Sequence, residues 1–266
     1  IQNRLMSTKM PVLFVGHGSP MIALEENNFT RGFRQVTAEI PKPDVIICIS
    51  AHWETEGTFV TGMETPRTIH DFGGFPRELY EVQYPAPGNP ELAGEIIDTL
   101  RQYSVGPDYQ WGLDHGTWTV LKHMYPDADI PVVQLSLDRS KTPQEHYSLA
   151  RCLSDFRNRG ILIMGSGNMV HNLHLLDWGR INDDDYGFGW AISAAEKMYG
   201  YITANNHAPL IDYFTQGEDF RLSIPTPEHY LPMLYALALQ TDNEKVEFFN
   251  RGFVGGSLVM TALKIG

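Results

Sequence analysis

Three histidines of this 266-residue chain share one feature: each follows an apolar run with the composition of a buried β-strand. They are His17 after residues 12–15, His52 after residues 45–50, and His171 after residues 161–164 and a Gly-rich turn. Ligands of open α/β sheets bind outside the carboxyl ends of the strands, so imidazoles delivered to that edge can converge on one metal ion. Spacing alone leaves open the alternative that each is an ordinary hydrogen-bonded turn residue.

A fourth histidine is expected to join this group from a helix. Thr226 and Pro227 are typical of a helix start, which places His229 in the first turn. The positive end of a helix dipole disfavours protonation of an imidazole and leaves a nitrogen free to bind a metal. His115 follows Asp114 in a sequence typical of a loop, where it is either an acid or base near the metal or a surface turn residue.

Other residues have competing interpretations. His70 and Asp71 stand in a long Gly- and Pro-rich stretch, where they either line a substrate pocket or stabilise the loop. We expect a structural role for His174. Three histidines in helix-like or polar surroundings are predicted to lie at the surface: His123, His146 and His207. Three aromatic residues are candidates for pocket walls or for the core: Trp111, Trp118 and Tyr230.

The elements that must position these side chains alternate between β-rich runs and amphipathic windows, which is typical of an α/β domain. Strands are predicted at residues 11–15, 45–50, 58–61, 131–137, 161–164, 246–249 and 257–265. Helices are predicted at residues 28–40, 90–103, 143–158, 188–204 and 227–240. We therefore predict a single-domain α/β fold with a mostly parallel central sheet flanked by helices, and a metal site at the C-terminal ends of the strands. Residues 10–266 would form the catalytic domain, and residues 1–9 an upstream extension or expression-derived leader.

Composition excludes several classes of protein. Hydrophobic residues make up 42% and aromatic residues 11% of the chain, which is too much for a disordered protein. The formal charge of −12 disfavours nucleic acid and anionic membrane surfaces as partners. No apolar run approaches the roughly 20 residues that a bilayer requires. Two cysteines, Cys48 and Cys152, provide no disulfide framework, so we expect a reducing, cytoplasmic location.

Seven segments, in order along the chain, resemble motifs of the LigB-type (class III) extradiol ring-cleavage dioxygenases. They are Gly16–Pro20, Ser50–Trp53, His70–Pro76, Tyr84–Gly88, Asp114–Trp118, Gly167–Asn172 and Pro225–Tyr230. Within this family the chain is most similar to the branch of 4,5-DOPA extradiol dioxygenases, and the resemblance extends from about Met10 to the C-terminus.

The resemblance implies an enzyme that opens a catechol such as DOPA or caffeate with O₂ at a non-haem divalent metal, with Fe(II) for activity and Zn(II) as an ion that a purified sample also retains. The residues that match metal ligands by motif are His17, His52 and His229. His171 matches a residue that is either a fourth ligand or the acid–base histidine, and His115 matches a second pocket histidine. Better-known members complete the metal site with a glutamate, whereas this chain has His229 with Glu228 beside it. Such an all-histidine set also suits zinc.

Two other function classes stay open. A zinc-dependent hydrolase can use an all-histidine site to generate hydroxide, although the sequence lacks HExxH and its inverted form. A non-catalytic binding protein can share the fold. Nucleotide binding and serine hydrolase chemistry are not predicted, because the Gly-rich turns lack P-loop spacing and Ser19 lies outside a nucleophile elbow. The sequence leaves open the physiological catechol, 4,5 against 2,3 cleavage, and a monomer against a dimer.

Overall fold

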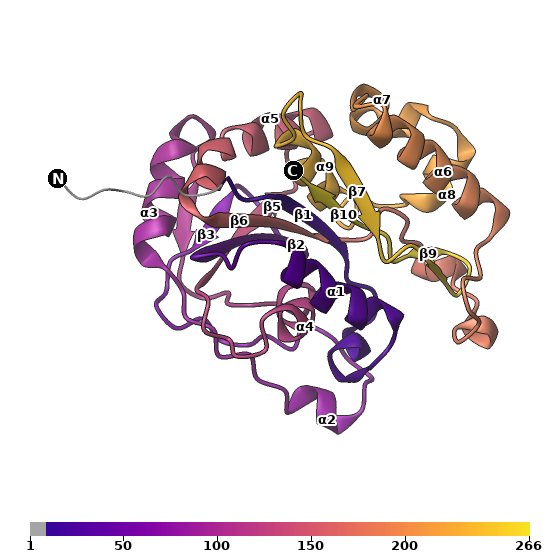
Figure 1. Cartoon of the computed structure of the whole chain (residues 1–266), viewed down its shortest axis with the longest axis horizontal. Coiled ribbons are helices and arrows are strands. Elements are labelled where there is room, and N and C mark those ends of the chain that lie inside the picture. The colour runs from indigo at the N-terminus through magenta and orange to yellow at the C-terminus, as the bar shows by residue number, and fades with distance from the viewer. Residues whose placement is uncertain (1–8) are drawn as a thin grey trace.

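Eight strands form one continuous sheet through the centre of the molecule (Figure 1). The computed structural model describes residues 9–266. In order across the sheet, the strands are β4 (Gly106–Asp108), β3 (Phe59–Thr61), β5 (Val132–Asp138), β2 (Val45–Thr55), β6 (Ile161–Gly167), β1 (Val12–Gly16), β10 (Ala262–Ile265) and β7 (Val246–Phe249). A separate two-stranded sheet pairs β8 (Phe253–Val254) with β9 (Leu258–Val259).

The four central strands, in the order β5-β2-β6-β1, run parallel to one another. Antiparallel pairing occurs only further out in the described sheet, where β3 pairs with β5, β10 with β1, and β7 with β10. Every residue of β1, β5 and β6 is buried, as expected for parallel strands that are covered on both faces. The predicted single-domain α/β fold with a mostly parallel sheet is confirmed.

Helices cover both faces of the sheet (Figure 1). They are α1 (Asn28–Glu39), α2 (Arg77–Tyr80), α3 (Pro90–Thr99), α4 (His115–Met124), α5 (Pro143–Arg151), α6 (Gly189–Thr203), α7 (Ala208–Ile211), α8 (Glu218–Ser223) and α9 (Leu231–Ala238). Side chains alternate along β1, so Val12 and Phe14 pack in one apolar cluster with α3, α5, α6 and α9. Leu13 and Val15 pack in the other cluster with α1 and α4.

The helix predicted over residues 227–240 is wrong in its start. The helix α9 begins at Leu231, and the preceding residues form a turn in which the N–H groups of Tyr230 and Leu231 donate to the carbonyl of Pro227. The Thr226 hydroxyl donates to the Glu228 carboxylate at 2.8 Å instead of accepting from a helix N–H. His229 therefore precedes the helix, and the argument from its first turn does not apply.

The loop predicted around His115 is also wrong, because His115 is the first residue of α4. Every residue of α4 except Lys122 is buried, including its threonines and histidines, so no exposed polar face opposite an apolar one marks this helix in the sequence. The strand β2 continues to Thr55 through an irregularity in its register with β5 between Ile49 and Glu54. His52 consequently lies within this strand and not beyond its end.

Three histidines predicted to lie at the surface are buried, with at most 9% of each residue exposed: His123, His146 and His207. Each ring is hydrogen-bonded inside the protein, to the carbonyl of Ile22, to the Tyr235 hydroxyl, and to Tyr147 and Gln240, respectively. A sequence does not reveal such partners, because they come from distant segments.

The predicted extension falls outside the described residues except for Lys9. Within residues 9–266, no helix is both long and apolar enough to cross a bilayer.

Candidate metal centre

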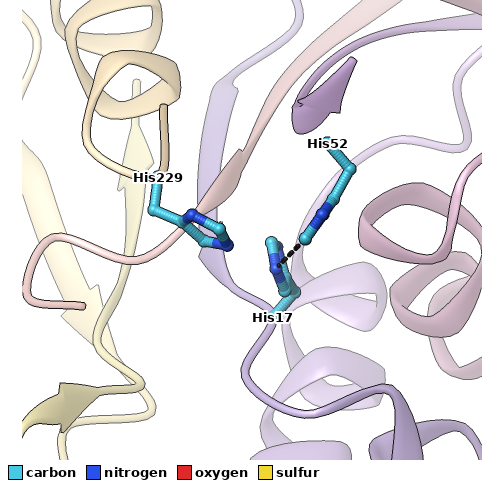
Figure 2. Close-up of side chains that lie close together, drawn as sticks. All are labelled: His17, His52 and His229. Carbon is cyan, nitrogen blue, oxygen red and sulfur yellow. Dashed lines mark hydrogen bonds between the residues drawn. The ribbon is translucent and has the colours of Figure 1, made fainter. Parts of the chain in front are cut away.

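Three imidazoles converge at the C-terminal edge of the parallel strands (Figure 2). His17 follows β1, His52 lies in the irregular part of β2, and His229 lies in the turn before α9. One nitrogen from each ring lies within 4.8 Å of the other two, and the Nε2 atoms of His17 and His52 are 3.0 Å apart. The rings point toward one another, so the structure brings together three of the four residues predicted to bind metal.

Glycines at the strand ends allow this convergence. A Cβ atom on Gly167, at the end of β6, would lie 2.1 Å from the carbonyl oxygen of His229. The next residue, Asn168, donates its backbone N–H to the same carbonyl at 2.8 Å. Only a residue without a side chain permits this approach, which holds the turn that carries His229 against the end of β6.

The outer nitrogen of each clustered ring faces a hydrogen-bond acceptor. His17 Nδ1 lies 3.0 Å from Ser166 Oγ, whose own proton is donated to the carbonyl of Gly116. The hydroxyl must therefore accept from His17, which leaves Nε2 of that ring unprotonated. The corresponding Nδ1 atoms lie 3.7 Å from Asp71 Oδ2 for His52 and 3.3 Å from Glu228 Oε1 for His229. Such outer contacts orient the histidine ligands of metal sites.

The electrostatics keep these rings uncharged. Burial, reinforced by neighbouring histidines, lowers the pKa of His17 and of His52 well below the ordinary value. Burial also lowers the pKa of His229, against the opposing effect of Glu228. Burial opposes ionisation of Glu228, but hydrogen bonds from His229, the backbone and Thr226 lower its pKa to about 2.

This donor set fits a divalent transition metal. The Nε2 atoms of His17 and His52, 3.0 Å apart, are close enough for one neutral ring to donate its N–H to the other, and a metal cation can replace that proton between the two nitrogens. Neutral imidazole is a good ligand for iron and for zinc. The chemistry of the three rings therefore suits either ion.

His171 lies beside this cluster and not within it. Its ring stacks on that of His229, with centroids 3.5 Å apart and an angle of 5° between the planes. Burial and the neighbouring His229 lower the pKa of His171 to about 3, so the ring is uncharged at neutral pH. The nearby His174 is exposed on the following turn and does not face the site.

His115 reaches the site from the N-terminus of α4. Its ring centroid lies 3.8 Å from that of His52, and its Nδ1 lies 2.9 Å from Asp71 Oδ2. Of the two alternatives for the long loop, Asp71 lines the site, whereas His70 stabilises the loop through its Nε2 and the carbonyl of Val82, 2.9 Å apart. The sequence marks Asp71 by its place in a long loop and in the segment His70–Pro76, but neither signal predicts its partners.

A buried carboxylate links the elements that carry two of these histidines, and sequence analysis did not identify this role. Asp114 precedes α4 and accepts hydrogen bonds from Ser50 of β2 at 2.6 Å and from Gln134 of β5 at 2.8 Å. Burial, with the nearby Asp71, raises the pKa of this carboxyl group. Trp111 donates a further bond to Asp114 at 3.3 Å and stacks on Trp53. The other two candidate wall residues, Trp118 and Tyr230, are buried in the core.

Comparisons with known proteins agree with this geometry. Residues 11–184 match the family described as the catalytic LigB subunit of aromatic ring-opening dioxygenase. The chain is 46% identical over 267 residues to 4,5-DOPA dioxygenase extradiol of Escherichia coli (strain K12), covering 98% of this chain and 97% of that protein. It is 36% identical over 249 residues to the Beta vulgaris protein of the same name, covering 91% of each. A crystal structure of an uncharacterized protein from Escherichia coli K12 superposes with a TM-score of 0.83 at 42% identity, covering 97% of this chain and 100% of that one.

Proposed function

Because this chain belongs to the LigB family of aromatic ring-opening dioxygenases and is an extradiol enzyme of that family, we propose that it cleaves DOPA or a caffeate-like catechol with O₂ at one non-haem metal ion. The single observation that carries the proposal is the convergence of three neutral imidazoles at the edge of the sheet. Relatives of similar length bear the name 4,5-DOPA dioxygenase extradiol, which supports DOPA as the first substrate to test.

In this proposal, His17, His52 and His229 hold the metal ion. When bound, Fe(II) supplies a redox-active centre through which electron density passes from the catecholate to O₂, a role that Zn(II) does not support. Ser166 accepts from the outer Nδ1 of His17 and Glu228 faces the outer Nδ1 of His229, which keeps these two rings oriented. Residues 10–266 act as one catalytic domain.

The proton chemistry is assigned to two further histidines. A catechol must lose a proton before both of its oxygens can chelate a metal, so an uncharged base is required nearby. Burial lowers the pKa of His171 to about 3, so its ring is uncharged before the reaction. The ring can therefore act first as a base, and it can donate a proton only after it has accepted one. His115, on the other side of the cluster, is the second candidate donor of the proton needed for ring opening.

The test is anaerobic loading of metal-stripped protein with Fe(II) or, separately, with Zn(II). DOPA or caffeate is then added with O₂, and both oxygen uptake and the coloured ring-opened product are followed. We expect stoichiometric uptake and product with Fe(II) alone, and neither in a His17→Ala variant. The ring-opened product, identified by mass and NMR, distinguishes 4,5 from 2,3 cleavage.

A zinc hydrolase is the second candidate, because the three clustered ligands include no carboxylate. A Zn(II)-loaded protein that hydrolyses esters or amides and consumes no oxygen with any catechol would support it and refute the dioxygenase proposal. Catechol binding without turnover on either metal would instead support a binding protein.

We also propose a cytoplasmic location, which both free cysteines, Cys48 and Cys152, support.

A further inference from the structure

One carboxylate outside the proposed ligand set contacts two histidines of the site. Asp71 Oδ2 lies 2.9 Å from His115 Nδ1 and 3.7 Å from His52 Nδ1. Its other oxygen, Oδ1, accepts a hydrogen bond from the backbone N–H of His115 at 2.8 Å. The side chains of Asp71 and His115 are 16% and 6% exposed, so water competes little for these contacts.

We propose that Asp71 is a positioning residue that holds the His115 ring in the tautomer protonated on Nδ1. In that tautomer Nε2 is unprotonated and can accept a proton, which His115 must hold on this atom before it can donate one during ring opening. Among residues 9–266, no group is hydrogen-bonded to Nε2 of His115, whereas Nδ1 faces the carboxylate. The consequence for turnover rests on the proposed function, but the tautomer itself does not.

The loop that carries Asp71 is anchored at Ile69, two residues before the carboxylate, to the segment that begins α4. Ile69 donates its N–H to Leu113 at 2.7 Å, and the Trp118 indole donates to the carbonyl of Ile69 at 2.8 Å. The bond from the His115 N–H to Oδ1 also satisfies one of the free N–H groups at the start of α4. With Oδ1 engaged there, Oδ2 is left for the imidazole.

Oδ2 and Nδ1 lie 2.9 Å apart but outside hydrogen-bond geometry, so within residues 9–266 Nδ1 is buried without a hydrogen-bond partner and the carboxylate is the charged group that faces it. The distance to His52 is 0.8 Å longer than the distance to His115, which makes His115 the main partner. The neighbouring carboxylate, Asp114, does not compete for this role, because Ser50 and Gln134 already donate to it.

Asp71→Asn is the decisive variant. Its amide oxygen can still accept from the His115 N–H, but its NH₂ group then faces Nδ1 and favours the opposite tautomer. In uniformly ¹⁵N-histidine-labelled, metal-free protein, long-range ¹H–¹⁵N spectra report the protonated nitrogen of each ring. The His115 signals are identified by their loss in a His115→Gln variant. We expect Nδ1–H in the original protein and Nε2–H in Asp71→Asn, with no change in Asp127→Asn, which alters an exposed aspartate after α4.

Kinetics and metal binding separate this role from a general structural one. We expect kcat of the iron-loaded Asp71→Asn variant to fall about 10²-fold, with KM and metal affinity within about threefold of the original. The double variant Asp71→Asn/His115→Gln should be no slower than His115→Gln alone, because Asp71 acts through the His115 ring and that ring is already absent.

The proposal is wrong if His115 of the original protein is protonated on Nε2, or if Asp71→Asn leaves its tautomer unchanged. A tenfold loss of metal affinity in Asp71→Asn without a change in the His115 tautomer would also overturn it. That result would show that Asp71 orients the ring of His52 instead. If the tautomer switches but no form of the protein consumes oxygen, the positioning role stands and the proposed dioxygenase function fails.

Discussion

Removing the Ser166 hydroxyl tests whether the outer contacts of the histidine cluster set its affinity for metal. Ser166 is fully buried, and its Oγ is the acceptor that faces His17 Nδ1. In Ser166→Ala the Nδ1–H group is left buried without a partner, and the missing hydroxyl leaves too little room for a water molecule. The unsatisfied donor costs about 1–3 kcal/mol of folding stability. Metal affinity should fall about 10- to 100-fold, which corresponds to about 1.4–2.8 kcal/mol, because the ring loses the contact that orients Nε2.

The assay is a competition titration of metal-stripped protein with Zn(II) against a chromophoric chelator, paired with urea unfolding. Ser136→Ala is the matched control, since Ser136 is equally buried on β5, two strands away in the sheet, but bonds to Thr55 and to the backbone of Phe59. We expect both variants to lose stability and only Ser166→Ala to lose metal affinity. A Ser166→Ala variant that binds metal as tightly as the original protein would refute the reasoning.

Four further predictions follow from the same structure. His52→Ala should abolish tight metal binding in the same titration, and full metal retention would remove His52 from the site. His171→Ala should keep both fold and metal but lose about 10²-fold or more in turnover, measured by oxygen uptake. Burial lowers the pKa of His146 from 6.5 to about 4, so the unfolded chain takes up a proton that the folded chain does not; stability is lost as the pH falls from 6.5 to 4, by up to about 3 kcal/mol. Urea unfolding at pH 7 and 4.5 should show a smaller loss in His146→Gln. Glu244→Gln leaves the guanidinium of Arg157, 1% exposed, without its anionic partner while the carbonyls of Met10 and Leu239 still accept from it, and should lower the free energy of unfolding by about 3 kcal/mol, measured at pH 7.

Strongly periodic or uniformly apolar strands were predictable from the sequence. The runs that became β1, β2 and β6 begin with continuous stretches of apolar residues, and burial on both faces in a parallel sheet produces that pattern, whereas in β5 Gln134 and Ser136 interrupt the apolar residues. The capped start of α5 at Thr142 was also predictable, because the capping box is a purely local motif. Helix α4 was missed, since burial on every side removes the period on which helix prediction depends.

The candidate site shows the same division. Strand ends and family motifs predict that His17, His52 and His229 lie together, and the structure brings their rings within reach of one ion. His229 reaches the cluster by a different route from the one predicted, through a turn that lies against Gly167. Local signals favoured a helix there because Thr and Pro are common helix starts, but the Thr226 hydroxyl bonds to a side chain instead.

The sequence by itself determined the α/β fold class, the positions of the main strands along the chain and the family, because periodicity, caps and motifs are properties of neighbouring residues. Only the tertiary structure decided which acceptor faces which ring: Ser166 for His17, Asp71 for His52 and His115, and Glu228 for His229. Three of these four contacts join segments that are far apart in the chain. No local pattern encodes such pairings, since the packing of strands and loops against one another brings the partners together.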